Sequence, residues 1–213
     1  MSPEGVSIHV ARMRLVEVTP ESLKEMVKDS VKAAEDLATA EVDIIVYGCT
    51  SGVLLEGPEW ERNLVQLIQS RSGIRTITTA YAVIEALKAL SARKIVVATP
   101  YIEELNIREK RFLEDSGVEV LNIKGLGIVK NIDIGKQSPW TAYQLVKKVF
   151  VPQANAVFIN CTNFRTIEIL DILEKDLRRP VISSNSASIW LALRKLGIGQ
   201  SIKGYGILLE SKL

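Results

Sequence analysis

The chain has 213 residues, of which 47% are hydrophobic and 24% charged, and its 27 basic and 25 acidic residues leave a formal net charge of +2. A chain of this length and composition is expected to bury a hydrophobic core as one large domain or two small lobes. Because the two signs of charge are well mixed along the sequence, neither a nucleic acid nor an anionic membrane is expected as its main partner.

Short β-branched runs alternate with longer amphipathic stretches along the whole chain. In chain order, the pattern predicts a strand at 6–10, a helix at about 20–40, a strand at 43–47, helices at 58–70 and 80–90, a strand at 94–98, a helix at 102–115, a strand at 118–123, a loop with three glycines at 124–138, a helix from 139, a strand at 156–159, a helix at 165–177, a strand at 180–182 and a helix at 187–196. Such alternation indicates an α/β protein with parallel sheets flanked by helices.

Two parts of the chain resemble each other. Residues 77–79 (Ile-Thr-Thr) and 182–184 (Ile-Ser-Ser) each precede a helix-like stretch, and each lies downstream of a predicted strand that ends in Cys-Thr. Strand–helix chains often contain weak echoes of themselves, but the matched cysteines favour a duplication. We interpret the pattern as two similar lobes.

The chain has two cysteines, and each follows a predicted strand. Cys49 lies in the segment Gly-Cys-Thr-Ser-Gly and Cys161 in the segment Asn-Cys-Thr-Asn-Phe. No apolar run approaches the ~20 residues of a membrane span, and the N-terminus lacks the apolar core of a signal peptide. A cytoplasmic location is therefore expected, and in that reducing compartment both cysteines are expected to be free thiols.

Both cysteine turns have the composition of an anion-binding site. In a parallel α/β sheet, ligands bind beyond the carboxyl ends of the strands. Thr50 and Ser51 after the first cysteine, and Thr162 and Asn163 after the second, supply hydroxyl, amide and backbone N–H groups suited to a carboxylate. The start of a helix is also expected to lower a thiol pKa from ~8.5 towards neutrality. A single buried cysteine is usually inert, but two that face each other across a cleft could add to carbon, take a proton or give one.

Other chemistries find less support in the sequence. His9 is the only histidine and lies in a predicted strand, which argues against a Ser-His-Asp or Cys-His arrangement. No CxxC or HxxxH spacing indicates a metal site, and the glycines at 125 and 127 lack the third glycine and the following helix of a dinucleotide site. Neither a metal nor a nucleotide cofactor is expected.

Several motifs occur together in an order that is typical of one family. They are the segments 3–15, 48–52 (Gly-Cys-Thr-Ser-Gly), 99–101 (Thr-Pro-Tyr), 131 with 134–135, 161–166 (Cys-Thr-Asn-Phe-Arg-Thr) and 183–185 (Ser-Ser-Asn). Over nearly its whole length the chain resembles the maleate cis–trans isomerase and arylmalonate decarboxylase branch of the aspartate/glutamate racemase superfamily. The resemblance implies two pseudo-symmetric α/β lobes, formed by residues 1–92 with 186–213 and by residues 93–185, with the active site between them.

The resemblance also implies a reaction that uses no cofactor. Cys49 would add as a thiolate to the double bond of a small dicarboxylic acid such as maleate, and Cys161 would be its acid–base partner. Tyr101 and Asn131 would contact a substrate carboxylate. Further substrate contacts are implied for the polar residues of the two turns, Thr50, Ser51, Thr162 and Asn163.

Several alternatives stay open. An amino-acid racemase of the aspartate/glutamate type also uses two cysteines, whereas an arylmalonate decarboxylase keeps only the second, and the chain could instead be a non-catalytic carboxylate binder. A redox protein is disfavoured, because cysteines on opposite sides of a cleft are expected to be too far apart for a disulfide. Members of the family usually begin with an earlier strand and an Asn-containing loop that precede Pro3, and we expect their absence to leave the site or a sheet edge incomplete. A homo-oligomer, either a dimer or a dimer of dimers, is expected to cover such an edge.

Overall fold

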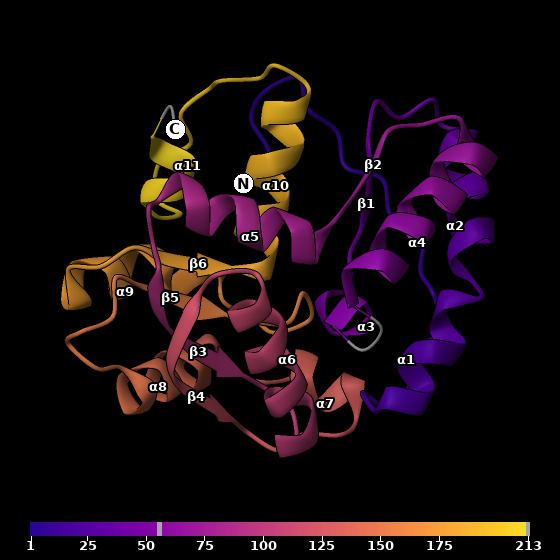
Figure 1. Cartoon of the computed structure of the whole chain (residues 1–213). Helices are drawn as coiled ribbons and strands as arrows, with labels where there is room; N and C mark the ends of the chain where they lie inside the picture. The colour runs from indigo at the N-terminus through magenta and orange to yellow at the C-terminus, as the bar shows by residue number, and fades with distance from the viewer. Residues whose placement is uncertain (55–56, 212–213) are drawn as a thin grey trace.

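The computed structural model of the protein describes residues 1–54 and 57–211. Its strands form two parallel sheets with helices packed on them, which confirms the predicted α/β class (Figure 1). The smaller sheet pairs β1 (Ile45–Tyr47) with β2 (Thr76–Thr78). The larger sheet has the order β4-β3-β5-β6, and its strands are β3 (Lys94–Thr99), β4 (Glu119–Gly125), β5 (Ala156–Ile159) and β6 (Val181–Ser183).

The core of the molecule lies around the two central strands of the larger sheet. The side chains from Ile95 to Ala98 in β3 and from Ala156 to Ile159 in β5 are almost completely buried. Both strands are short continuous apolar runs, as expected for strands that are covered by helices on both faces. The packed core therefore holds the carboxyl ends of both strands, and the residues that follow them, in fixed positions.

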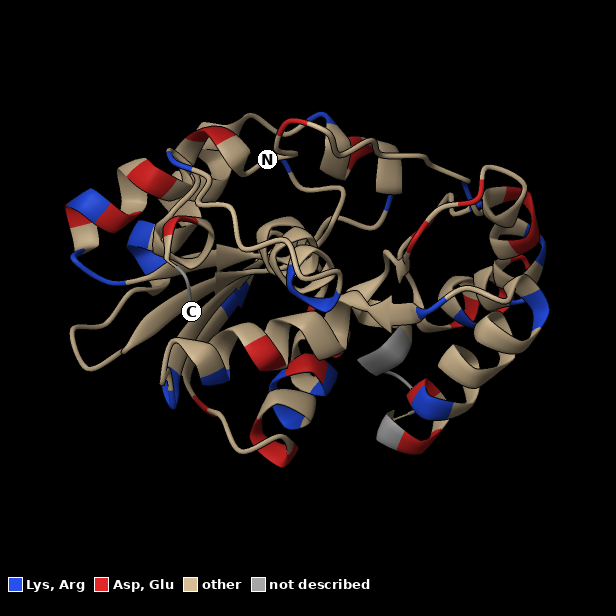
Figure 2. Ribbon diagram, turned by 90° about the horizontal axis from the view of Figure 1, so that it is seen from above, with Lys and Arg blue, Asp and Glu red and all other residues tan. Residues whose placement is uncertain are grey.

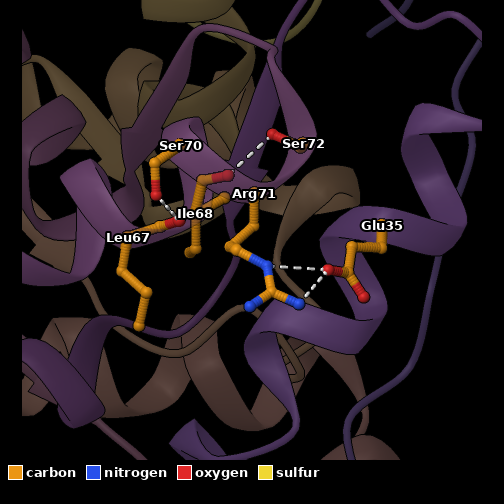
Figure 3. A network of polar contacts seen from close by, with 6 residues as sticks. All are labelled: Glu35, Leu67, Ile68, Ser70, Arg71 and Ser72. Atoms are coloured by element: carbon orange, nitrogen blue, oxygen red, sulfur yellow. Dashed lines mark hydrogen bonds and ion pairs between the residues drawn. The ribbon is translucent and has the colours of Figure 1, made fainter.

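The helices on the N-terminal side surround the smaller sheet. They are α1 (Pro20–Val27), α2 (Ser30–Ala38), α3 (Thr50–Leu54), α4 (Gly57–Ser72) and α5 (Thr79–Ala89). Helices α2 and α4 pack against each other, and Arg71 of α4 donates to Glu35 of α2 from Nε at 2.9 Å and from Nη2 at 2.7 Å (Figure 3). Since both side chains are largely exposed, this ion pair is expected to add little to the stability that packing provides.

The remaining helices belong to the larger sheet or connect it to the smaller one. They are α6 (Glu103–Asp115), α7 (Asn131–Gly135), α8 (Pro139–Val149), a 3₁₀ turn (Ile167–Ile169), α9 (Leu170–Leu177), α10 (Ser184–Lys195) and α11 (Ile207–Glu210). Helices α5 and α10 lie side by side, and α5 also contacts strands of both sheets (Figure 1).

The two similar sequence segments make the same turn from a strand into a helix. Thr78 caps α5 by accepting a hydrogen bond from the Tyr81 N–H at 3.0 Å, and Ser183 caps α10 by accepting one from the Ser186 N–H at 3.1 Å. A side-chain oxygen in this place satisfies one of the free N–H groups at a helix start. The similarity is therefore structural as well as sequential, while the division of the chain into two lobes stays a prediction.

The structure contains two short helices that were not predicted, α3 and α11, and α10 begins three residues before the predicted start; four further differences are larger. The predicted strand at 6–10 is wrong, because no described residue pairs with this segment, and it leaves Ile8 59% and Val10 79% exposed. The predicted helix at 20–40 is two helices, α1 and α2, separated by a turn at residues 28–29. The predicted loop contains the end of β4 and all of α7. The helix expected from 165 begins only with the 3₁₀ turn at Ile167.

Charged residues of both signs are scattered over the helices, as the mixed sequence indicates (Figure 2). Within the described part of the chain, no helix has the length and apolar character that a membrane crossing requires.

Candidate active site

Both cysteine turns open onto one cavity of about 980 Å³. The structure brings all of the sequence-predicted site residues together on its wall, namely Cys49, Thr50, Ser51, Tyr101, Asn131, Cys161, Thr162 and Asn163. They come from the ends of β1, β3 and β5 and from the start of α7, segments that are far apart in the sequence. The extended N-terminal segment also lines the cavity. The roles of the individual residues stay predictions, but their convergence on one cavity is a property of the fold.

Cys49 lies between the end of β1 and the start of α3 and is 9% exposed. Its Sγ accepts a hydrogen bond from the Gly52 N–H at 3.4 Å and lies 3.7 Å from the Ser51 Oγ. Burial raises the pKa of the Cys49 thiol, and these donors oppose that effect only in part. The prediction that this pKa falls towards neutrality is therefore wrong, because desolvation of the thiolate outweighs the donors.

Cys161 follows β5 and has an unusual backbone conformation. Its φ of +91° lies in the left-handed region that non-glycine residues rarely adopt. Its N–H contacts the Asn160 Oδ1 closely and the Ser184 Oγ at 3.1 Å, so two buried acceptors hold the turn in this conformation. The strained backbone is thus fixed by side chains that surround it.

Tyr101 is the hydrogen-bond partner of the Cys161 thiol. Its hydroxyl donates to the Cys161 sulfur, which opposes a larger effect of burial, and the pKa of Cys161 is raised to about 11. Burial and the neighbouring sulfur in turn hold the pKa of Tyr101 well above its usual value. At neutral pH both groups therefore carry their protons. Cys161 is suited to donate a proton, and Tyr101 is suited to stabilise the thiolate that remains.

A second tyrosine at the cavity was not predicted from the sequence. Tyr47 is 3% exposed, and its hydroxyl has no hydrogen-bond partner among the described residues. This hydroxyl and the Cys49 Sγ lie 3.2 and 3.3 Å from the point where a Cβ on Gly52 would stand, so the two atoms flank Gly52. Burial and the nearby Cys49 raise the pKa of Tyr47. The signal in the sequence is its place two residues before the cysteine, since side chains two apart in an extended chain share a face.

The two predicted asparagine ligands bind each other at the cavity wall. Asn163 Nδ2 donates to the Asn131 backbone oxygen at 2.8 Å and to its Oδ1 at 2.9 Å. Asn131 Nδ2 in turn donates to the Leu15 carbonyl at 3.2 Å. Both amides are therefore held at the cavity wall, and a carboxylate that binds there must compete for their donors.

The two predicted threonines connect the cysteine turns. Thr162 Oγ1 donates to the Gly48 carbonyl at 2.8 Å, and Thr50 Oγ1 lies 3.1 Å from the Ser184 Oγ. Each bond joins residues that are more than one hundred positions apart in the sequence. These hydroxyls fix the distance between the two turns, which sets the separation of the two sulfurs.

Metal-binding side chains do not gather in the described part of the chain. Among these residues there is no group of three or more His, Cys, Asp or Glu side chains that could hold a metal ion. His9 is exposed on the N-terminal segment, where its Nε2 lies 3.3 Å from the Ser7 Oγ. It lines the cavity but is far more exposed than either cysteine.

Comparisons with known proteins find relatives over nearly the full chain. A family model described as arylmalonate decarboxylase matches residues 1–209. The chain is 29% identical over 215 residues to a maleate isomerase of Geobacillus stearothermophilus, covering 98% of this chain and 86% of that protein. It is 27% identical over 196 residues to an arylmalonate decarboxylase of Bordetella bronchiseptica, covering 91% and 82%. A crystal structure of a cysteine-to-alanine variant of the maleate isomerase Iso from Pseudomonas putida S16 with maleate superposes with a TM-score of 0.92 at 26% identity, covering 96% of this chain and 84% of that one.

Proposed function

This chain belongs to the arylmalonate decarboxylase family, and from its two-cysteine cavity we propose that it is a cofactor-independent cis–trans isomerase of a small dicarboxylic acid, of the maleate-to-fumarate type. The observation that carries the proposal is the presence of Cys49 and Cys161 on the wall of one cavity. Relatives named maleate isomerase support it, and so does the similar fold of an isomerase solved with maleate.

The first half of the reaction is an addition to the double bond. The Cys49 thiolate forms a carbon–sulfur bond to one alkene carbon, and the π electrons move to the other carbon and into its carboxylate. The Cys161 thiol then transfers its proton to that carbon, which leaves a saturated thioether and a Cys161 thiolate. The former double bond is now a single bond about which the molecule can rotate.

The second half reverses these steps after rotation. The Cys161 thiolate removes the proton, the double bond forms again, and the carbon–sulfur bond breaks to release the Cys49 thiolate. The reaction consumes no oxidant, reductant or water, because every atom and electron that enters the first half leaves in the second. Such a mechanism requires that both sulfurs reach the same bound substrate.

The surroundings of the two sulfurs suit these different roles. Cys161, with a pKa of about 11, is protonated at neutral pH, and Tyr101 donates to its sulfur. The Gly52 N–H and the Ser51 hydroxyl contact the Cys49 sulfur and stabilise its anion. Donors around the carboxylate stabilise the enediolate that forms during addition more than the bound substrate. We assign this role to Tyr101 and Asn131, together with the turn residues Thr50, Ser51, Thr162 and Asn163. The Tyr101 and Thr162 hydroxyls, each with one proton, must leave the Cys161 sulfur and the Gly48 carbonyl to donate to the substrate.

The test is direct measurement of maleate turnover. The wild-type chain is expected to convert maleate into fumarate, followed by the change in ultraviolet absorbance and by NMR. A parallel assay in deuterated water tests for exchange of the α-hydrogen of aspartate and glutamate, and a third follows release of carbon dioxide from an arylmalonate. Exchange without isomerisation would identify a racemase, and carbon dioxide release alone would identify a decarboxylase. Binding of dicarboxylates by calorimetry with no turnover in any assay would indicate a non-catalytic binder.

Location and assembly belong to the same proposal. We place the protein in the cytoplasm, because both cysteines are free thiols and reducing compartments keep them so. We propose a homodimer because the N-terminal segment leaves Ile8 and Val10 exposed, and apolar side chains on an extended segment favour pairing with another surface. Light scattering after gel filtration tests the assembly.

A further inference from the structure

A carboxyl group lies buried behind the cavity and has no part in the proposed reaction. Glu109 belongs to the inward face of α6, between Leu105 and Phe112, and is 1% exposed. This place in an amphipathic helix is normally apolar, because burial of a carboxyl without good partners is unfavourable. Neither oxygen of Glu109 has a hydrogen-bond partner of ordinary geometry among the described residues. A group that disfavours folding in this way calls for a functional explanation.

The group that faces Glu109 is the side-chain amide of Asn160. It lies close enough to oppose in part the effect of burial on the Glu109 pKa. On the other side of the amide, Oδ1 accepts from the Cys161 N–H and from the Ser184 Oγ, the latter at 2.9 Å. The Cys161 N–H can only donate, so the amide oxygen must point towards it and Nδ2 must point away. Nδ2 has no other partner of ordinary geometry among the described residues, which leaves the carboxyl as its acceptor.

Asn160 controls the geometry of both cysteine turns. Its Oδ1 contacts the N–H of Cys161, the residue held at a φ of +91°. Through Ser184, whose Oγ lies 3.1 Å from Thr50 Oγ1, the same amide also reaches the turn of Cys49. A rotation of the Asn160 amide would place Nδ2 against the Cys161 N–H, donor against donor, and release the turn that carries Cys161.

Glu109 is also close to the acid–base pair. Its charge raises the pKa of Tyr101, the partner of Cys161, and the two sulfurs act on Tyr101 in the same direction. From the other elements packed on α6, the described residues of α3 carry no ionisable side chain, and β4 contributes only the exposed Glu119 and Lys124. No buried cation among these groups would compensate a charge on Glu109.

We propose that Glu109 is a positioning residue of the isomerase reaction proposed above: its neutral carboxyl orients the Asn160 amide and so holds Cys161, and its ionisation opposes formation of the Cys161 thiolate. Burial raises the pKa of Glu109 to about 8, so the carboxyl is neutral at neutral pH. Above that pH a negative charge appears behind Tyr101 and Cys161. Proton transfer to the substrate then leaves two negative charges near each other, and turnover falls although Cys161 itself ionises only at about 11.

The experiment compares two variants of Glu109 with a matched control on the same helix. Glu109→Gln keeps an oxygen that can accept from Asn160 but cannot ionise. Glu109→Leu keeps the bulk but offers no acceptor. The control is Glu114→Gln, which makes the same change at a largely exposed residue paired with Lys110. Thermal unfolding of each variant confirms that it is folded.

Two readouts are followed as a function of pH. The first is kcat and KM with maleate, and the second is the rate at which iodoacetamide alkylates Cys161, resolved from Cys49 by peptide mass spectrometry. Glu109→Gln is expected to keep kcat at pH 7 and to lose the fall in activity near pH 8, with faster alkylation of Cys161 than in the wild type above that pH. Glu109→Leu is expected to lose on the order of tenfold or more in kcat with a smaller change in KM, because misplacement of the acid–base group slows the chemical step.

Three outcomes decide the proposal. A Glu109→Gln variant that keeps the wild-type fall near pH 8, or a Glu109→Leu variant with wild-type kcat, would show that Glu109 acts only in packing. If the wild-type chain does not convert maleate, the proposed function fails, but the alkylation profiles still test Glu109. Identical profiles for Cys161 in all four proteins would then overturn the positioning role by themselves.

Discussion

The two cysteine turns begin with similar sequences but are supported in different ways. Cys49 leads directly into the helix α3, has an ordinary backbone conformation, and places its sulfur against the Gly52 N–H. Cys161 has a left-handed backbone, is followed by an irregular segment up to Ile167, and is held by the side chains of its neighbour Asn160 and of the distant Ser184. The backbone donor to the first sulfur is local, whereas the backbone of the second turn is fixed in part by a distant side chain.

This difference explains how two equal thiols can have unequal roles. The Gly52 N–H and the Ser51 hydroxyl oppose part of the effect of burial on the Cys49 pKa, and they stabilise the anion that acts as nucleophile and leaving group. The sulfur of Cys161 also has backbone donors in its own turn, but the hydrogen bond that opposes burial most comes from Tyr101, and its pKa is raised to about 11. The two cysteines are therefore suited to different roles although their turns begin with similar sequences.

Replacement of each cysteine tests this asymmetry with the largest expected effect. Cys49→Ser is expected to lower maleate turnover by ~10³-fold or more and to form no covalent adduct, because the nucleophile is lost. Cys161→Ser is expected to lower turnover to a similar extent but to retain addition at Cys49, seen as a mass increase of one substrate in the intact protein. If the adduct instead forms on Cys161 in the Cys49 variant, the roles are reversed.

The two tyrosines test the same comparison at a smaller scale. Tyr101→Phe is expected to lower kcat by ~10²-fold, as is typical for the loss of one preorganised donor at a charge that forms during the reaction. Tyr47→Phe is expected to have a weaker effect, about tenfold, because Cys49 keeps the Gly52 N–H as a donor. Steady-state kinetics of the two variants, measured side by side, provide the ratio of their losses in kcat. Equal losses would mean that both turns depend on their tyrosines to the same degree.

The buried carboxyl behind the second turn leads to a prediction about stability. The pKa of Glu109 is raised by burial from 4.5 to about 8, so the unfolded chain gives up this proton at a lower pH than the folded one. Between these two values the carboxyl increasingly disfavours folding, by ~1.4 kcal/mol per pH unit at most. Glu109→Leu is therefore expected to gain stability over the wild type as the pH rises from 5 to 8, measured by urea unfolding at each pH. If the difference in the free energy of unfolding between the variant and the wild type stays constant with pH, the raised pKa of Glu109 is contradicted.

The smallest effect is expected for the exposed ion pair between α2 and α4, which contacts neither cysteine turn. Arg71→Ala removes the exposed ion pair with Glu35 and is expected to lower the free energy of unfolding by ~0.2–1 kcal/mol, with less effect at high salt. Turnover is expected to be unchanged. A large loss of activity in this variant would show that the first turn depends on distant contacts as much as the second does.

The residues that line the cavity could be predicted from the sequence because they lie in short local motifs. The two strand ends with Cys-Thr indicated a ligand site by themselves, and the resemblance to the family added the Thr-Pro-Tyr segment and Asn131. The residues that hold the second cysteine turn in place could not be found from the sequence. Asn160 and Glu109 occupy positions that read as core, one beside a buried strand and one within an apolar helix stripe, and only the tertiary structure shows what they face.

The errors in the predicted elements have a similar cause. The segment 6–10 has the residues of a strand, but a strand also requires a neighbour, and no described residue supplies one. The segment 20–40 has a continuous apolar stripe, yet the first helix ends at Val27 and a second begins at Ser30. Helix α7 has only five residues and ends in a glycine, which is too little for a periodic pattern to be recognised.

The left-handed backbone of Cys161 has a consequence for any attempt to make the protein more heat-resistant. Glycine adopts such a conformation without the penalty of ~1–2 kcal/mol that a side chain incurs. A library selected for survival at high temperature alone would therefore enrich Cys161→Gly, a variant that is more heat-resistant but has lost its activity. A cysteine can persist at position 161 only while selection acts on turnover as well as on heat resistance.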